Sequence, residues 1–513
     1  MYECPNCGGN LKFNIARQKL YCEHCETTVD PYKFYKEKDA EERVIPVDDA
    51  GAEIPEGAEE EYEVTVFTCP QCGGEILSED TTAATFCSFC GSATILDSRV
   101  SRERKPSYII PFTKTKEDCE AAYAKMMRRA IFAPKELKDQ KHIEKFRGIY
   151  MPYWVYSFEK NGPASFPGKT TQRRGDYVYT KHYQLACEVE EKYEGLAYDA
   201  SASFSDNLSN AIAPFDLRKG KPFAPTFLSG FYADTSDVDR YVYESDAENI
   251  VIRDACNRIA RQPGCRKYHV NEGPNLSPLR NAVRPTKSEA ELAMLPVWFL
   301  SYRKGDRVSY AVVNGQTGEM AADLPIDWKR YLLGSALLTI PLFVLLNLFF
   351  TITPTTILWI AAALALICAL ISGMQLSHLF AREAGEDDKG LMAARLEQKK
   401  AGRKWSAQTQ SLAAAMAEAR ERQGGNRQGK EKKKSGSGRI KDMLPTLAKP
   451  LLGIVFAVMI QMLNPVADEM YYIGTFVCMG TVLWAIMDII RHYNLLTTRK
   501  LPQFNRRGGD ENA

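Results

Sequence analysis

Cys4-Pro5-Asn6-Cys7-Gly8-Gly9 stands near the start of this 513-residue chain, and Cys22-Glu23-His24-Cys25 follows with fourteen residues between the two cysteine pairs. The same pattern returns 65 positions later as Cys69-Pro70-Gln71-Cys72-Gly73-Gly74 and Cys87-Ser88-Phe89-Cys90. Two thiolates on one tight turn can hold a metal ion, and a second pair completes a tetrahedral sulfur site. The pattern therefore predicts two zinc ribbons, which are small β modules with one structural Zn²⁺ each. The predicted ligands are Cys4, Cys7, Cys22 and Cys25 in the first ribbon and Cys69, Cys72, Cys87 and Cys90 in the second.

Both predicted sites are closed, because all four coordination positions are filled by protein ligands and none remains for an activated water. Modules this small depend on their metal for folding. Disulfides in a secreted scaffold are the alternative, which the zinc-like spacing and the lack of a signal-peptide pattern before Cys4 disfavour. The other cysteines are expected to be small buried side chains; they are Cys119, Cys187, Cys256, Cys265, Cys368 and Cys478.

The C-terminal part of the chain contains four apolar stretches, each near the roughly 20 residues that cross a bilayer. They are Tyr331–Phe350, Thr355–Met374, Leu447–Leu463 and Met470–Ile490. Lys449 is the only Lys or Arg inside them, and it lies near the start of the third stretch, where it can snorkel. Two buried helical hairpins of a soluble core are the alternative. The length of the stretches and their near-absence of charge favour four membrane spans, without internal charge pairs.

The loops orient these spans. Lys329 and Arg330 precede the first span, and the long loop from Ser377 to Thr446 is rich in Lys and Arg. The short loop from Asn464 to Glu469 carries only negative charge. The positive-inside rule then predicts a multi-pass plasma-membrane protein with both termini and the long loop in the cytoplasm. That compartment is reducing, as free zinc-binding thiolates require.

The net charge of +2 hides an uneven distribution, with an acidic linker between the ribbons and a basic loop between the second and third spans. Within that loop, Leu412–Arg422 is helix-prone and Gly424–Gly438 has a disordered composition. Contact with anionic lipid, contact with nucleic acid and a simple role in topology all remain open for it. The predicted division is zinc ribbon 1 (1–36), acidic linker (37–63), zinc ribbon 2 (64–99), central α+β domain (100–327), membrane hairpin 1 (331–376), basic cytoplasmic loop (377–446), membrane hairpin 2 (447–490) and cytoplasmic tail (491–513).

The central region is long enough for a substantial core. Its periodicity predicts helices at Lys114–Arg129, Pro134–Phe146 and Val238–Ile259 and strands at Ile149–Tyr156, Leu295–Tyr302, Ser309–Val313 and Glu319–Ala322. Gly175–Tyr198 alternates like a β-hairpin or one long strand. Met151–Lys160 resembles Leu295–Lys304, and each follows a segment that contains a helix. We therefore expect an α+β domain of two related halves that share a sheet, in a multidomain chain.

No catalytic set emerges from this region, and the chain is not expected to be an enzyme. Gly162–Thr170 ends in Gly-Lys-Thr like a phosphate-binding loop, but it has five residues between its glycines and two prolines that cannot donate amides. We interpret it as a surface loop. The acids of the same region are expected to cap helices and turns; they are Asp199, Asp206, Asp216 and Asp234.

With these motifs in place, the chain resembles a family of uncharacterised bacterial membrane proteins with transcription-factor-IIB-type zinc ribbons. Besides the ribbons, the resemblance depends on Ile109–Phe112, Tyr150–Trp154, Leu295–Trp298 and Val313–Gly318. It implies zinc on the eight cysteines and supplies no established activity.

Three functions follow as hypotheses. The first is a membrane-anchored, non-catalytic adaptor that holds a cytosolic protein partner through the ribbons and the central domain. The second is nucleic-acid binding at the membrane, for which Lys12, Arg17 and Lys19 form a small basic cluster, whereas Cys69–Cys90 contains no Lys or Arg. The third is transport or membrane remodelling, which four spans could perform as a homo-oligomer in the lipid bilayer.

Overall fold

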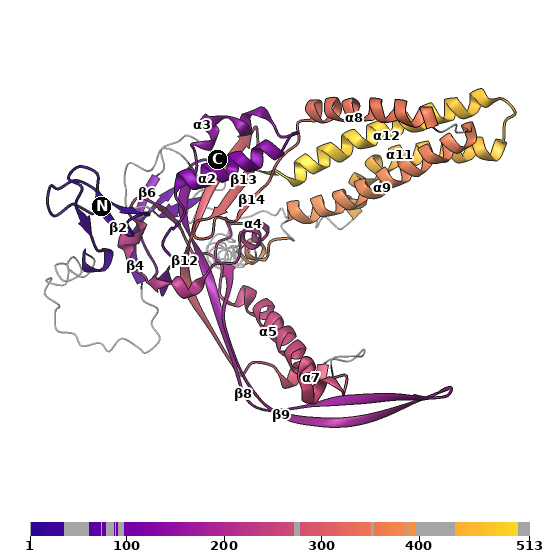
Figure 1. The fold of residues 1–513 in the computed structure, drawn as a ribbon. Helices are drawn as coiled ribbons and strands as arrows, with labels where there is room; N and C mark the ends of the chain where they lie inside the picture. Colours follow the sequence, from indigo (N-terminus) through magenta and orange to yellow (C-terminus); the bar gives the residue numbers. More distant parts are fainter. Residues whose placement is uncertain are drawn as a thin grey trace, which may run out of the picture.

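The molecule consists of a β-rich body, a set of long helices that extends from it and a long β hairpin that projects from the same body (Figure 1). The structure is a computed structural model, and it describes residues 2–34, 61–72, 74–77, 87, 89–90, 97–270, 277–349, 353–384, 387–394, 396 and 437–500. Most of the acidic linker, the Leu412–Arg422 segment, the Gly424–Ser435 stretch and the end of the tail lie outside the described residues.

The first ribbon is a three-stranded antiparallel sheet of β1 (Leu11–Asn14), β2 (Lys19–Cys22) and β3 (Thr28–Val29). Leu11 and Leu20 are fully buried, and Leu11 pairs with Cys22 across the first two strands. The short hairpin strands predicted between the cysteine pairs are therefore confirmed in this module.

A 12-stranded sheet forms the body, with the order β10-β7-β12-β8-β11-β5-β4-β6 along its main path; β9 pairs with β8, β13 with β12, and β14 and β15 with β13. Residues 149–156 of β8 are buried, as the aromatic composition of that strand requires. The strands are β4 (Glu61–Thr68), β5 (Glu75–Leu77), β6 (Asp97–Arg104), β7 (Tyr108–Ile109), β8 (Arg147–Arg174), β9 (Tyr177–Asp199), β10 (Lys221–Pro222), β11 (Tyr232–Asp234), β12 (Lys287–Lys304), β13 (Arg307–Asn314), β14 (Met320–Ala322) and β15 (Arg499–Lys500).

The second ribbon belongs to this sheet. Its strand β5 pairs with β11 of the central region, where Leu77 lies opposite Ala233. Its strands β4 and β6 continue the sheet to the edge. The sheet thus runs through the boundary that the sequence predicts at residue 99, because β6 extends from Asp97 to Arg104.

The helices of the body cover parts of the sheet (Figure 1). Thr115 and Asp118 form a capping box at the start of α2 (Lys116–Arg129), so the predicted first helix is confirmed. The predicted helix at 134–146 consists of two short turns, and the third corresponds to α5. The remaining helices are η2 (Lys135–Lys138), α3 (Gln140–Ile143), α4 (Asp206–Ala211), η3 (Leu217–Lys219), η4 (Pro225–Leu228), α5 (Tyr241–Arg261), α6 (Pro263–Arg266) and α7 (Ser277–Ala282).

The central region contains the same β-α-β-β arrangement twice, as β7-α2-β8-β9 and β11-α5-β12-β13. The halves exchange their first strands, since β7 lies parallel to β12 and β11 lies parallel to β8. Met151 and Leu295, the first residues of the two similar sequence stretches, lie directly opposite each other.

Equivalent hydrogen bonds recur in the two halves. Trp154 Nε1 donates to Val238 O at 2.8 Å, and Trp298 Nε1 donates to Lys114 O at 2.9 Å. In each case the acceptor lies just before the helix of the other half. The two related halves expected from the sequence therefore correspond to one arrangement that is built twice within a shared sheet.

The Gly-Lys-Thr string does not form the surface loop that the sequence indicates. Gly162–Thr170 lies inside β8 and pairs with β9, from Gly162 opposite Val189 to Thr170 opposite Lys181. Beyond Glu159, β8 pairs with β9 and no longer with β12. Among the described residues, the other edge of β8 then pairs with no strand. Proline is tolerated on such an edge strand, so the two prolines of the string are compatible with it.

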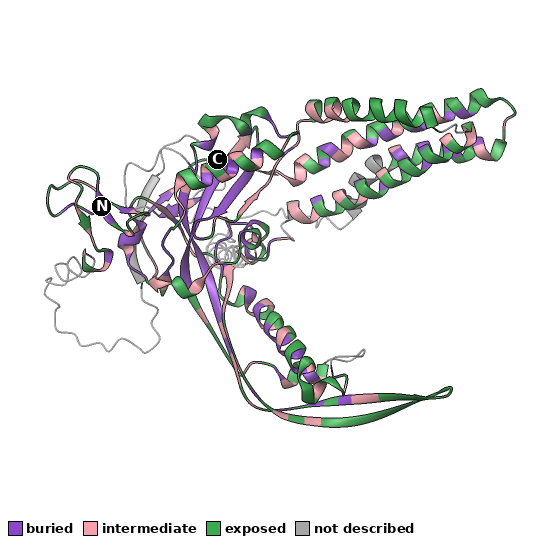
Figure 2. Ribbon diagram, viewed as in Figure 1, coloured by how far each residue is buried: buried purple, intermediate pink, exposed green. Residues whose placement is uncertain are grey.

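Four helices form the apolar part: α8 (Trp328–Phe349), α9 (Pro354–Ala384), α11 (Ser437–Leu463) and α12 (Asp468–Leu496). Three of them, α8, α9 and α12, are long and apolar enough to cross a membrane, whereas the apolar part of α11 is the shorter Ala448–Leu463. Leu358, Ala457 and Tyr471 belong to one buried cluster that joins α9, α11 and α12. The surface of α8 is largely exposed (Figure 2).

One expectation about these helices is wrong. Lys449 of α11 and Asp488 of α12 form an ion pair at 2.8 Å, although the sequence indicates no charge pair between the spans. The Lys449 amine also lies over the Trp484 ring, 4.4 Å from its centroid. Lys449 is near the start of its apolar stretch and Asp488 near the end of the next, so antiparallel packing brings together two charges that are 39 positions apart.

Candidate metal centres and the domain junction

The first tetra-cysteine cluster has the dimensions of a zinc site. Cys4 Sγ and Cys25 Sγ are 3.5 Å apart, as are Cys7 Sγ and Cys22 Sγ, and all four sulfurs lie within 4.8 Å of one another. A tetrahedral zinc with bonds of about 2.3 Å places its sulfurs about 3.8 Å apart. The four side chains therefore fit this metal with little movement.

The second cluster has similar dimensions and is more deeply enclosed. Its sulfur distances are 3.8 Å between Cys69 and Cys90 and 3.7 Å between Cys72 and Cys87. All four side chains are buried, whereas Cys7 of the first cluster is exposed. The eight cysteines chosen from their spacing are thus the members of two closed groups, and among the described residues no further group of His, Cys, Asp or Glu has ligand-like distances.

The backbone of the cysteine turns explains their glycines. Cys4 N donates to Gly9 O at 2.7 Å, and Gly8 has a φ of +70°, which favours glycine. A side chain at Gly9 would place its Cβ 2.7 Å from the His24 ring and 3.4 Å from Cys7 Sγ. The first ribbon therefore needs both glycines to bring its backbone close to the sulfurs.

The electrostatics of the clusters favour a bound cation. In the first cluster, the hydrogen bond between the Thr27 hydroxyl and Cys25 Sγ lowers the pKa of Cys25 to about 6. In the second, the hydrogen bond with Cys69 and burial raise the pKa of Cys72. Four buried sulfurs can be thiolates together only beside a positive charge, which Zn²⁺ supplies.

The first ribbon is attached to the central region through backbone and aromatic contacts. Phe13 N donates to Ser229 O at 3.0 Å, and Ser229 Oγ donates to Leu11 O at 2.5 Å. The rings of Phe13 and Phe227 are 5.2 Å apart. Because the buried residues of this ribbon share a core with the central region, its metal site supports the fold of the body.

The second ribbon inserts an aromatic side chain into the body. Phe89 lies between the last two cysteines and is 1% exposed. Its ring is 6.2 Å from that of Phe299, and its carbonyl accepts a hydrogen bond from the Tyr310 hydroxyl at 2.7 Å. His24 holds the equivalent position in the first ribbon and is exposed. The two ribbons thus use the same cysteine pattern with different contacts.

The basic cluster expected on the first ribbon is partly neutralised. Lys12 forms an ion pair with Glu23 at 3.4 Å. The Arg17 guanidinium lies over the Tyr21 ring at 4.6 Å. Only Lys12 is paired with a carboxylate among the described residues, so these contacts do not test nucleic-acid binding by this ribbon.

Polar contacts connect the β body to the helices. Asn494 of α12 accepts a hydrogen bond from Ile326 N at 2.7 Å and donates one to Ile326 O at 2.9 Å. Arg307 of β13 donates to Leu495 O at 2.7 Å, which satisfies a carbonyl at the end of α12. Arg382 of α9 pairs with a carboxylate of the body as well. The β body is therefore attached to the C-terminal ends of α9 and α12 by Arg382 and Arg307.

The sequence missed a group of buried acids. Burial raises the pKa of Asp199 well above its usual range, and Asp206 and Asp388 raise it further. Burial also raises the pKa of Asp388 to about 7. Asp388 follows α9 by only a few residues, and no local pattern indicates that it returns to the body beside β9. Asp216 precedes η3, but its side chain pairs with Arg218 at 2.9 Å and does not cap the helix, and Asp199 is buried.

Asp234 is another acid that the sequence assigned to a cap or turn. It is buried and accepts hydrogen bonds from the hydroxyls of Ser201 and Ser203, each at 2.5 Å. Burial raises its pKa to about 7, and nearby Asp237 adds to the shift. The Ser-Asp contacts connect the segment after β9 to the end of β11 and so belong to the packing of the body.

Comparison with known proteins gives one relative of low identity. The chain is similar to a protein of Bacillus subtilis (strain 168) named Uncharacterized protein YdjG, with 26% identity over 333 residues. The aligned part covers 64% of this chain and 90% of that protein. No family model matches the chain, and no solved structure matches it.

Proposed function

We propose that the chain is a membrane-anchored, non-catalytic adaptor with two structural zinc sites, and that it binds a cytosolic protein partner. The observation that carries the proposal is the β8–β9 hairpin, which leaves the body as a long arm (Figure 1). Closed sulfur sites stabilise a fold rather than activate water. The metal sites then support the body, and the arm is the part offered to a partner.

The arm packs against α5 near its base and carries exposed aromatic side chains at its tip. Near the base, Phe166 and Val189 pack with Ile252 of α5 in a buried cluster. At the tip, Tyr177 and Val178 are 73% and 63% exposed, and Tyr179 is exposed as well. Tyrosines on a supported protrusion supply contact area at a small entropic cost, and aromatic residues are enriched in the cores of protein interfaces.

The cytoplasmic orientation is part of the proposal. The β body contacts the start of α8, which carries Lys329 and Arg330, and the end of α12, which carries Arg491 and is followed by Arg499 in β15. The positive-inside rule assigns such ends to the cytoplasm, with both termini on that side of the plasma membrane. The free thiols of the two clusters fit this reducing compartment.

The test is site-specific photo-crosslinking of the full chain in the membranes of its own cells. A benzophenone amino acid replaces Val178 at the tip, and the matched control replaces Ile131, which is 70% exposed at the end of α2. We expect a discrete protein adduct from position 178 that is absent at position 131. Identical adducts at both positions, or adducts with lipid alone, would contradict an adaptor role for the arm.

A further inference from the structure

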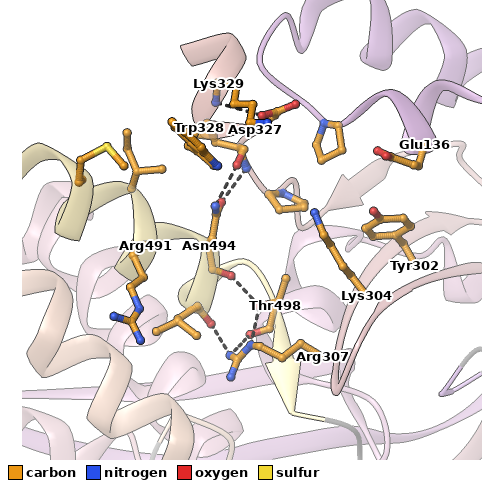
Figure 3. A pocket seen from close by; sticks show the side chains of 16 residues that line it. Glu136, Tyr302, Lys304, Arg307, Asp327, Trp328, Lys329, Arg491, Asn494 and Thr498 are labelled. Atoms are coloured by element: carbon orange, nitrogen blue, oxygen red, sulfur yellow. Dashed lines mark hydrogen bonds between the residues drawn. The ribbon is translucent and has the colours of Figure 1, made fainter. Parts of the chain in front are cut away.

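A cavity of about 570 Å³ lies where the β body meets the first turn of α8 and the last turns of α12 (Figure 3). Its walls come from η2, the facing ends of β12 and β13, the segment Pro325–Lys329, the last turns of α12 from Met487 onward and Thr498 just after that helix. Both α8 and α12 are candidate membrane spans. The cavity therefore occupies the level at which these helices leave the β body, which is the interfacial zone of a bilayer.

The cavity carries uncompensated positive charge. Lys304, Lys329 and Arg491 line it from β12, α8 and α12 and stand around it in Figure 3. Within the described part of the chain, none of the three forms an ion pair. The lining contains two acids, Glu136 and Asp327, and Asp327 forms an ion pair with Arg330 at 3.9 Å. Glu136 is then the one remaining carboxylate of the lining, beside three cations.

The fourth cation of the lining, Arg307, has a different role. Its guanidinium donates to Leu495 O at 2.7 Å and to Thr498 O at 2.6 Å. These bonds hold the end of α12 in place and keep that wall of the cavity fixed. Arg307 thus holds the wall that carries Arg491 and leaves Lys304, Lys329 and Arg491 to contact a ligand.

An apolar wall adjoins the cations. Met487 and Ile490 of α12 and Trp328 at the start of α8 belong to the lining, and Trp328 is 47% exposed. Tryptophan followed by lysine at the start of a span is the usual composition of the membrane–water interface. Along α8, Leu337 is 74% exposed, so this helix presents apolar side chains that lipid would cover.

We propose that this cavity binds the phosphate headgroup of an anionic glycerophospholipid. The ammonium groups of Lys304 and Lys329 and the guanidinium of Arg491 would hold the phosphate. The part of the acyl chains nearest the headgroup would lie against Met487 and Ile490. A lipid in this place contacts α8, α12 and the β body together. It would fix the direction in which the body, and with it the hairpin arm, leaves the membrane.

The experiment is native mass spectrometry of the full chain in detergent, titrated with phosphatidylglycerol and, in parallel, with zwitterionic phosphatidylcholine. The variant is the double substitution Lys304→Gln and Arg491→Gln, and the matched control is Lys138→Gln, an exposed lysine of η2 outside the lining. We expect phosphatidylglycerol to bind the native chain and to bind the double variant about thirtyfold more weakly, from about 1 kcal/mol for each cation. Lys138→Gln should bind like the native chain.

Two further arms keep the result decisive. Zinc content and the melting temperature establish that the double variant is folded, and Lys329→Gln alone replaces it if it is not. Glycerol 3-phosphate distinguishes a lipid from a soluble phosphate, and the account requires it to bind far more weakly than the lipid. Equal binding of the double variant and the native chain, equal binding of the two lipids, or tight binding of glycerol 3-phosphate would each overturn the proposal.

Discussion

Replacement of Phe89 by alanine should destabilise the second ribbon, whereas the equivalent replacement of His24 should leave the first ribbon unaffected. The same cysteine turn holds a buried aromatic side chain in the second ribbon and the exposed His24 in the first. Phe89 is 1% exposed and packs against Phe299. Truncation of a fully buried phenylalanine costs about 3–5 kcal/mol in transfer and cavity energy. The bond from Tyr310 goes to the main-chain carbonyl and remains, so the side-chain cost applies without an added polar penalty. His24→Ala, at an exposed site, should change stability by no more than about 0.5 kcal/mol.

The assay is urea titration of the full chain in lipid nanodiscs, with released zinc measured by a chromophoric chelator. With a slope of about 2–3 kcal/mol/M, Phe89→Ala should lower the urea midpoint of zinc release from the second ribbon by about 1–2.5 M. The midpoint of His24→Ala should coincide with that of the native chain. If both variants release zinc at the native midpoint, the second ribbon does not depend on its insertion into the body, and the reasoning fails.

Three other perturbations test the remaining parts of the account. Asn494→Ala removes both hydrogen bonds to Ile326 and should weaken the attachment of the body to α12 by about 2 kcal/mol. Faster amide exchange of residues 323–328 would measure this loss, and unchanged exchange would refute the attachment. Because burial raises the pKa of Asp388 from the ordinary 3.8 to about 7, the folded chain binds this proton more tightly than the unfolded chain, and the stability of the segment 387–394 should fall as pH rises from about 4 to about 7 and then level off. Amide exchange of that segment, corrected for its intrinsic pH dependence, should show this loss. Asp388→Asn should reduce it, with neighbouring Asp199 supplying the remainder, and a pH dependence that the substitution leaves unchanged would refute the assignment to Asp388. Removal of zinc by a strong chelator should make the central sheet sensitive to protease, because both clusters share packing with it, whereas resistance equal to that of the untreated chain would mean that the ribbons fold independently.

Local patterns predicted the parts of the fold that depend on local physics. The cysteine spacing identified both clusters, and the similarity of Met151–Lys160 to Leu295–Lys304 indicated two related halves that meet in one sheet. Residues 149–156 of β8, 292–301 of β12 and 308–314 of β13 form nearly continuous buried runs that are rich in apolar and aromatic side chains, and a sequence shows such runs directly.

The parts that were missed depend on contacts between distant segments. The pairing of Leu77 with Ala233 places the second ribbon in the central sheet, and no local pattern encodes a partner 156 positions away. Asp388 is buried beside Asp199 only because the chain returns to the body after α9. Gly162–Thr170 has the composition of a loop, yet its prolines lie in a strand that, among the described residues, pairs there with β9 alone.

The most direct test of the central claim is the metal content of the full chain purified without added metal. The account holds that the two tetra-cysteine clusters are closed structural zinc sites. Elemental analysis should therefore find two zinc ions per chain, and one after Cys4→Ser with Cys7→Ser or after Cys69→Ser with Cys72→Ser. A chain that lacks zinc and keeps its fold, with the same cysteines as free thiols or disulfides, would contradict the account.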